Sequence, residues 1–499
     1  MEIKGTDLIS LFEKSLQGIV EKDLHEIGFV IQVGDFSCRV HGLRNAVYGE
    51  LVAFEGGNKG IIFNLDEDEV AVFLIDAYKP VVELEVVKRT GDVFKAPVGM
   101  QLCGRVLNVM GKPLDALGNL ISEAYEPIEA IIPGIIERSP VNESLETGIM
   151  AIDALVPIGK GQRELILGNR NTGKTSIVLD TILNQKEKNV YCIYVSIGQR
   201  QANLARIVKT LEEKGAIDYT VVISADASEP ALDRYLAPYV GCTIAEYFRN
   251  KKLDALIIYD DLSNHAIAYR EMSLLMRRAP GREAYPGDIF YLHSRLLERA
   301  GKLASGGSLT ALPLVQIQAD DFTTYIPTNL ISITDGQIFL DSKLFNKGIR
   351  PAVNFELSVS RVGGAAQTKA IKRMTRALKL ELAQYHELLD FSQFGTELDI
   401  ISQKRLERGA RIVELLKQEE GAPINFVDQA LKLFLLQENY LNVLTVKQVA
   451  HFAQQFVSYV KSVYGELYKH IKETAEISDE TMVRLKEAAI EFNKIFVPA

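Results

Sequence analysis

The sequence predicts a multidomain chain with an N-terminal antiparallel β-barrel, a central α/β domain and a C-terminal α-helical bundle. Three kinds of hydrophobic periodicity along the 499 residues support this order. Apolar and polar residues alternate near the start, short apolar strands alternate with helical stretches in the middle, and helical spacing dominates the end. We place the amphipathic N-terminal helix at 1–24, the barrel at 25–90, the α/β domain at 91–370 and the helices at 371–499.

The leading segment carries an apolar stripe at helical spacing, formed by Leu8, Leu11, Phe12, Leu16, Ile19 and Val20. Such a helix either packs on its own domain or docks on another protein. Periodicity alone leaves both alternatives open.

The barrel prediction depends on period-two alternation. Phe36, Cys38 and Val40 alternate with polar residues, and Val82, Leu84 and Val86 alternate with polar or smaller ones. Turn residues separate these runs, which is typical of several short strands in a small antiparallel barrel.

In the middle of the chain, the clearest expected strands are 164–167, 191–196, 219–224 and 255–260. Their alternation with helices predicts a mostly parallel sheet covered on both faces. For the last helix we expect Ser478 as the N-cap, followed by one apolar stripe. That stripe consists of Met482, Leu485, Ala488, Phe492 and Ile495.

Composition excludes several classes of protein. There are 56 basic and 65 acidic residues, a net charge of −9, which disfavours a broad nucleic-acid-binding surface. No apolar run approaches the roughly 18 residues of a membrane-spanning helix. The four cysteines, Cys38, Cys103, Cys192 and Cys242, follow no paired spacing, so we expect free thiols and neither disulfides nor a zinc site.

The strongest motif is Gly168-Asn169-Arg170-Asn171-Thr172-Gly173-Lys174-Thr175, which matches a phosphate-binding loop. In such a loop, backbone N–H groups surround the phosphates, the lysine reaches the β- and γ-phosphates, and the hydroxyl binds Mg²⁺. A predicted strand precedes the loop and a predicted helix, 176–183, follows it. The α/β domain is therefore predicted to be a P-loop (RecA-like) domain that binds ATP or ADP with Mg²⁺.

A second motif is the apolar strand Leu256-Ile257-Ile258-Tyr259-Asp260-Asp261, which ends in two carboxylates. An aspartate at this position holds the Mg²⁺ shell opposite the hydroxyl of the phosphate loop. We therefore expect Thr175 and Asp260 at the metal, with Asp261 as the weaker candidate.

Beyond these shared motifs, the chain resembles the alpha subunit of F-type ATP synthases over nearly its whole length. The resemblance is carried by the segments GIMAIDALVPIGKGQRELILGNRNTGKTS, YCIYVSIGQR, LIIYDDLSNHAIAYREMSLLMRRAPGREAYPGDIFYLHSRLLERAGKL, YIPTNLISITDGQIFL and GIRPAVNFELSVSRVGGAAQTKA. It implies an alternating hexamer of three alpha and three beta subunits around a rotating gamma shaft, with catalytic sites mainly on beta. The alpha chain would be the non-catalytic subunit of a proton-transporting two-sector ATPase.

The resemblance also implies partners and a location. The N-terminal helix would contact the delta subunit of the peripheral stalk, and the head would meet the membrane sector only indirectly. We expect a peripheral membrane protein on the cytoplasmic face of a bacterial plasma membrane, or on the matrix or stroma side in an organelle. No nucleic-acid partner is expected.

Gln199, in Ile197-Gly198-Gln199-Arg200, separates alpha from beta. In the family's beta subunits a glutamate at the matching position activates water, whereas an amide cannot take a proton at neutral pH. This glutamine argues against a homohexameric secretion-type ATPase, and the acidic barrel argues against a Rho-type RNA translocase. A paralogous alpha-like subunit with another role remains open.

By the same resemblance, Arg361 matches the family's arginine finger, which stabilises transition-state charge in trans on a beta subunit. The nucleotide pocket departs from the family pattern, which has Asp, Gln and Gln where this chain has Asn169, Asn171 and Glu420. Adenine contacts are therefore expected to weaken or rearrange, and Phe345 and Arg350 lie at matching positions near the base. The expected nucleotide-binding residues are Gly168, Arg170, Asn171, Thr172, Gly173, Lys174, Thr175, Ser176, Gln199, Phe345, Arg350, Gln418 and Glu420.

Overall fold

The computed structural model describes residues 26–75, 79–392 and 399–496. The predicted N-terminal helix of residues 1–24 lies outside them. Contacts divide the chain into two compact units, one of residues 1–95 with 271–279 and one of residues 96–270 with 280–499. The first unit holds the barrel, and the second holds the sheet domain together with the C-terminal helices.

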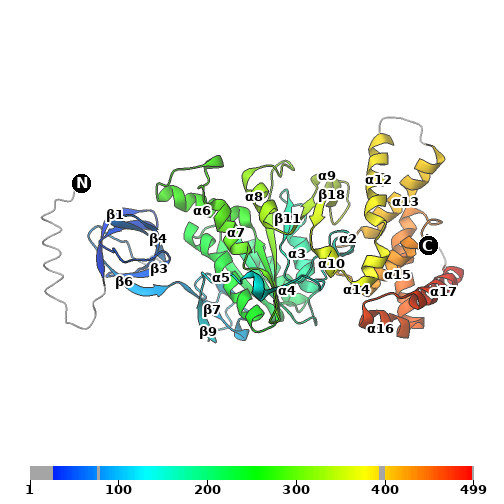
Figure 1. The fold of residues 1–499 in the computed structure, drawn as a ribbon, viewed down its shortest axis with the longest axis horizontal. Helices are drawn as coiled ribbons and strands as arrows, with labels where there is room; N and C mark the ends of the chain where they lie inside the picture. Colours follow the sequence, from blue (N-terminus) through cyan, green and yellow to red (C-terminus); the bar gives the residue numbers. More distant parts are fainter. Residues whose placement is uncertain (1–25, 76–78, 393–398, 497–499) are drawn as a thin grey trace. The chain divides into compact units, whose positions relative to one another are not determined.

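Six antiparallel strands close into the barrel in the order β1-β2-β5-β4-β3-β6 (Figure 1). Their bounds are β1 (Ile27–Gly34), β2 (Ser37–His41), β3 (Glu50–Phe54), β4 (Lys59–Leu65), β5 (Glu69–Ile75) and β6 (Val86–Val93). Alternate residues such as Cys38, Val40 and Val52 fill the barrel core, as period two requires.

The predicted alternation is wrong in two places, at Phe36 and at Val82 with Leu84; Val82 is 59% exposed and lies before β6. Phe36 is 55% exposed and lies in the β1–β2 turn with φ 54°, so it does not join the core face. Leu84, with φ 69°, lies in a turn before β6 begins at Val86. In both places the chain reverses direction, and the turn geometry overrides the apolar pattern.

The central sheet runs in the order β18-β17-β11-β16-β14-β12-β13-β8 and is parallel from β17 to β8. Its strands are β8 (Val106–Asn108), β11 (Glu164–Gly168), β12 (Val190–Gln199), β13 (Thr220–Asp226), β14 (Asp254–Asp260), β16 (Ser308–Gln316), β17 (Gly336–Leu340) and the antiparallel β18 (Val353–Ser360). The antiparallel β15 (Gly301–Leu303) and β10 (Arg138–Ser139) extend from β16, and β7 (Lys95–Val98) pairs with β9 (Ala124–Pro127) in a separate small sheet. The four strands expected from sequence are present, because apolar runs such as that of β14 need cover on both faces.

The helices of this domain are α2 (Met150–Leu155), α3 (Lys174–Leu183), α4 (Gln201–Glu213), α5 (Ala231–Asn250), α6 (Leu262–Leu275), α7 (Ile289–Leu297), α8 (Tyr325–Ile333), α9 (Ser342–Asn346) and α10 (Gly363–Ala366). Short 3₁₀ turns lie at Met100–Leu102, Ile135–Glu137, Ile217–Tyr219 and Arg282–Ala284. The parallel strands β11, β12, β13, β14, β16 and β17 are each followed by a helix, and the loops at the carboxyl edge of such a sheet form ligand sites.

The C-terminal part is helical, as predicted, and consists of α11 (Lys369–Met374), α12 (Leu378–Ser392), α13 (Ile400–Leu416), α14 (Phe426–Gln437), α15 (Val446–Val463), α16 (Gly465–Thr474) and α17 (Asp479–Ile495). Ser478 caps α17 by accepting a hydrogen bond from the Thr481 N–H at 3.1 Å. Four residues of the predicted stripe are buried, but Ile495, in the last turn, is 60% exposed.

One hydrophobic core continues from the sheet domain into these helices, and it includes Ile166, Ile177, Leu416 and Phe434. The segment after α13 is held beside α3, where the Gly421 N–H donates to Asp180 Oδ1 at 2.8 Å. No helix within the described ranges is long and apolar enough to cross a membrane. The domain boundaries proposed from sequence stay predictions, and those after residues 90 and 370 fall within β6 and α11.

Candidate nucleotide-binding site

The phosphate loop connects β11 to α3 at the centre of the parallel sheet. β11 is paired on both sides, with β16 and with β17, which fixes the start of the loop. Gly173 adopts φ 95° and Asn171 φ 61°, both in the left-handed region where glycine and asparagine are favoured. A Cβ on Gly168 would lie 2.8 Å from the Thr172 hydroxyl oxygen and 3.0 Å from the Leu340 carbonyl oxygen. The loop therefore needs these small residues to place its N–H groups and the N-terminus of α3 toward an anion.

Lys174 is folded over the loop that carries it. Its ammonium group donates to the carbonyl oxygens of Gly168 at 2.8 Å and Asn169 at 2.7 Å. An ammonium has three N–H donors, so one is left for a phosphate oxygen. Burial lowers the pKa of Lys174, and the nearby Asp261 and Asp260 carboxylates oppose that effect. The lysine is thus a partly desolvated cation in a cavity that would receive phosphate charge.

Asp260, at the end of β14, is the hub of a hydrogen-bond network. Its Oδ2 accepts from the Thr175 hydroxyl at 3.1 Å and from the Tyr194 hydroxyl at 2.6 Å, and its Oδ1 accepts from the Gln199 amide at 3.2 Å. Burial raises the pKa of Asp260, and these three donors oppose that rise. A hydroxyl and a carboxylate in contact are hard oxygen ligands of the kind Mg²⁺ prefers, and a cation would offset the cost of the buried charge. Thr175 and Asp260 therefore fit the predicted metal site.

Asp261 has a different task. Its Oδ1 accepts from the Asn264 N–H at 2.8 Å, so it caps the start of α6. Burial and the adjacent Asp260 charge raise its pKa to about 7. The weaker of the two metal candidates is thus engaged with its own helix.

Sequence reasoning missed Tyr194. Its ring is fully buried in β12 and its hydroxyl is a donor to Asp260. A tyrosine within the apolar run of a central strand could have indicated this contact, because a buried hydroxyl requires a polar partner.

A cavity of about 1160 Å³ contains nearly all the predicted nucleotide-binding residues. It is lined at one end by the phosphate loop from Arg170 to Ser176, with Gln199 and Asp260. Its walls also include Phe345, Arg350, Gln418 and Glu420, which come from α9, the loop before β18 and the segment after α13. Gly168 is not among the lining residues, and it acts through the loop geometry described above.

Asn169 lies on the outer side of the loop. Its side-chain Nδ2 donates to the Ser342 hydroxyl at 2.8 Å, and its side-chain Oδ1 accepts from the Asp320 N–H at 3.1 Å. Asn169, which differs from the family pattern, therefore supports the loop on the side away from the cavity. It is not among the residues that line the cavity.

The walls away from the phosphate loop combine one aromatic–cation pair with polar groups. The Arg350 guanidinium lies 4.6 Å from the centre of the Phe345 ring, which gives a flat surface suited to a planar base. The Ser176 hydroxyl donates to Glu420 Oε1 at 2.8 Å, so the first turn of α3 is tied to the segment after α13. These residues are far apart along the chain. From the sequence, only the family resemblance predicted that they share one site.

Comparison with known proteins agrees with this architecture. Models of the ATP synthase alpha/beta family match the β-barrel domain at residues 24–91, the nucleotide-binding domain at 148–360 and the C-terminal domain at 367–492. ATP synthase subunit alpha of Clostridium botulinum (strain Eklund 17B / Type B) is 51% identical over 502 residues, which cover 100% of this chain and 99% of that protein. The subunit alpha of Aquifex aeolicus (strain VF5) is 52% identical over 96% of both chains.

This chain belongs to the ATP synthase alpha subunits. The predicted family and fold class are confirmed, and the chain is a nucleotide-binding subunit of a proton-translocating ATPase.

Arg361 of this alpha-subunit chain lies just beyond β18 and is not among the residues that line the cavity. Its side chain is exposed, and its only hydrogen bond within the described ranges runs from the guanidinium to the Ile331 carbonyl oxygen at 3.5 Å. Its backbone is well held, since the N–H donates to the Asp335 carbonyl oxygen at 2.9 Å. A fixed backbone with a loosely held guanidinium suits contact with a neighbouring molecule.

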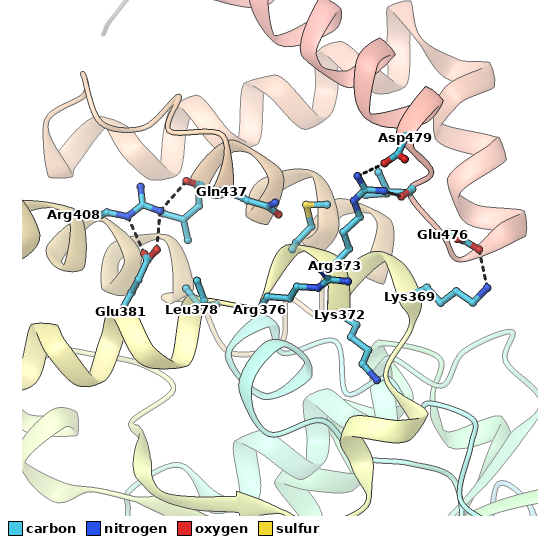
Figure 2. Close-up of a pocket in the computed structure, with 14 residues that line it drawn as sticks. Lys369, Lys372, Arg373, Arg376, Leu378, Glu381, Arg408, Gln437, Glu476 and Asp479 are labelled. Carbon is cyan, nitrogen blue, oxygen red and sulfur yellow. Dashed lines mark hydrogen bonds and ion pairs between the residues drawn. The ribbon is translucent and has the colours of Figure 1, made fainter.

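A second cavity, of about 690 Å³, lies among the C-terminal helices of the alpha-subunit chain (Figure 2). Its basic side chains are largely paired within it, as Arg373 with Asp479 at 2.6 Å and Lys369 with Glu476 at 2.8 Å. Arg408 likewise binds Glu381 at 2.8 Å. None of the predicted nucleotide-binding residues lines this cavity.

Proposed function

We propose that this chain is the regulatory, non-catalytic nucleotide-binding subunit of an ATP synthase head. It would bind Mg-ATP or Mg-ADP in the cavity at the phosphate loop. Lys174 and the N-terminus of α3 would hold the phosphates, and Thr175 with Asp260 would hold Mg²⁺, which supplies charge neutralisation at the phosphate oxygens when bound. Gln199 carries the proposal. Its Nε2 donates to Asp260 Oδ1 at 3.2 Å. An amide cannot accept a proton from water at neutral pH.

The chain's contribution to catalysis would be made elsewhere. We place Arg361 as an arginine finger that reaches the nucleotide of an adjacent beta subunit and stabilises charge as it develops. Its exposure and its place outside the chain's own cavity support this role. A guanidinium is suited to it because its planar donors can bind phosphate oxygens in pairs.

The assembly would be an alternating hexamer of three alpha and three beta subunits around the gamma shaft. Residues 1–24 would contact the delta subunit of the peripheral stalk. The chain would work as a peripheral subunit on the cytoplasmic face of a bacterial plasma membrane, in ATP synthesis and hydrolysis coupled to proton transport. The name shared by the relatives, ATP synthase subunit alpha, supports this placement.

The test is to compare nucleotide binding with turnover in the purified full-length chain. We expect Mg-ATP to bind while hydrolysis stays far below the rate of about 10 per second typical of enzymes. Lys174→Ala serves as the control for binding at this cavity. Turnover near that typical rate by the chain alone would contradict the non-catalytic assignment and favour a self-sufficient ATPase.

A further inference from the structure

Two nearby polar side chains of the cavity wall, Gln418 and Glu420, differ in the hydrogen-bonding capacity that is left for a ligand. Both N–H donors of the Gln418 amide are engaged with the backbone: Nε2 donates to the Gly148 carbonyl oxygen at 2.8 Å and to that of Ala422 at 2.9 Å. Its Oε1 accepts from the Met150 N–H at 3.1 Å. Since an amide has two N–H donors, Gln418 has none left for a base. It clamps the segment after α13 to the start of α2.

Glu420 retains an oxygen that is free to accept a hydrogen bond. Its Oε1 accepts from the Ser176 hydroxyl at 2.8 Å, and no bond of its Oε2 occurs among the described residues. The side chain is exposed and lines the cavity. A carboxylate only accepts hydrogen bonds, so a base that meets it must supply the donors.

The surroundings of Glu420 reinforce this preference for donors. Asp180, on α3, also lines the cavity, and its Oδ1 accepts from the Gly421 N–H at 2.8 Å. Burial, together with the charge of Glu420, raises the pKa of Asp180 to about 6. The Arg350–Phe345 surface stacks on any purine and does not discriminate between them.

The two common purines differ at the edge that a carboxylate would read. Guanine presents its ring N1–H beside its exocyclic amine, which gives two parallel donors for the two oxygens of a carboxylate. Adenine presents one amine beside an unprotonated N1, whose lone pair would face the negative oxygens. A glutamine would serve adenine well, because its amide both donates to N1 and accepts from the amine.

We infer that Glu420 reads the base and that this site accepts guanine nucleotides at least as tightly as adenine nucleotides. The inference rests on the proposed function, namely nucleotide binding in this cavity. It deepens that proposal by naming the ligand class and the residue that selects it.

The test measures the dissociation constants of Mg-ATP and Mg-GTP for the full-length chain by calorimetry. For the wild type we expect the constant for Mg-GTP to be no larger than that for Mg-ATP. Glu420→Gln should shift their ratio about tenfold toward ATP, which corresponds to about 1.4 kcal/mol. Mg-ITP, which keeps N1–H but lacks the exocyclic amine, should fall between the two in the wild type.

Glu419→Gln is the matched control. Glu419 is an exposed carboxylate that lines the same cavity and has no hydrogen bond among the described residues, so its loss should leave the ratio unchanged. A wild type that binds Mg-ATP more than about tenfold tighter than Mg-GTP overturns the inference. So does a ratio that Glu420→Gln leaves unaltered. Failure of both nucleotides to bind would instead show that the proposed function itself is wrong.

Discussion

The phosphate end and the remaining walls of the nucleotide cavity are built in different ways. The phosphate end comes from one loop, the first turn of α3 and the ends of two adjacent strands, β12 and β14. The remaining walls come from α9, the loop before β18 and the segment after α13, and the helical part shares a hydrophobic core with the sheet domain. Phosphate is bound by backbone and charge, whereas a base is read by individual side chains. The second kind of contact can change through one substitution while the first stays intact.

The largest expected effect of a substitution is on ATP turnover, and it lies outside the nucleotide cavity, at Arg361. In a complex reconstituted with beta and gamma subunits, Arg361→Ala should lower multi-site ATP turnover by about 10³-fold or more. The nucleotide occupancy of the alpha chain's own cavity should be unchanged, because Arg361 does not line that cavity. Steady-state turnover and nucleotide occupancy, measured on the same complex, check both statements.

Arg376→Ala is a suitable control for Arg361→Ala, since Arg376 is also exposed and has no hydrogen bond in the described part of the chain. Arg361→Lys should restore activity only in part, because the lysine lacks the planar pair of donors. Turnover of Arg361→Ala within about threefold of the wild type would remove Arg361 from the finger role.

At the phosphate end, Lys174→Ala should weaken binding of Mg-ATP and Mg-GTP alike, by about 100-fold or about 2.7 kcal/mol. The ratio between the two nucleotides should stay constant, in contrast to the effect of Glu420→Gln, because phosphates are common to both ligands. Calorimetry on the full-length chain measures both quantities. Lys209→Ala, at an exposed lysine of α4, is the control. A changed ratio of the two dissociation constants would mean that phosphate binding and base recognition are not independent.

The smallest effect concerns Asp180 and pH. Its folded-state pKa of about 6 lies above the value of about 3.9 in an unfolded chain. Its stabilising contribution is therefore present below about pH 4 and is lost as the pH rises through about 6. Asp180→Asn keeps an oxygen for the Gly421 N–H and removes this loss. Thermal melts should show a higher midpoint for the variant by a few degrees, with a larger gain at about pH 7.5 than at about pH 5.

A Glu420→Gln variant allows the same melting measurement to test whether Glu420 and Asp180 interact. The charge of Glu420 contributes to the raised pKa of Asp180, so the gain from Asp180→Asn should shrink in a Glu420→Gln background. An equal gain at both pH values would mean that Asp180 does not titrate in the expected range. A gain from Asp180→Asn that Glu420→Gln leaves unchanged would mean that the two carboxylates are not coupled across this part of the cavity.

The sequence by itself determined the domain order, the parallel sheet and the phosphate end of the cavity. Hydrophobic periods of two and 3.6 residues are set locally, and the loop from Gly168 to Thr175 keeps its chemistry within one continuous stretch. Asp260 could be predicted because an apolar central strand ends there. Alternation was misleading at Phe36 and Leu84, where a turn sets the backbone, and the helical stripe was misleading at Ile495, where the helix ends in solvent.

Only the tertiary structure decided which polar groups were already engaged. Asn169 turns to Ser342 behind the loop, both N–H donors of Gln418 are engaged by backbone carbonyl oxygens, and Asp261 caps α6. Tyr194 and Asp260 lie on different strands, and the parallel pairing of β12 with β14 brings them together. Hydrogen-bond capacity is a property of contacts between distant segments. A residue's type shows what it can donate or accept, but the fold decides how much of that capacity is left for a ligand.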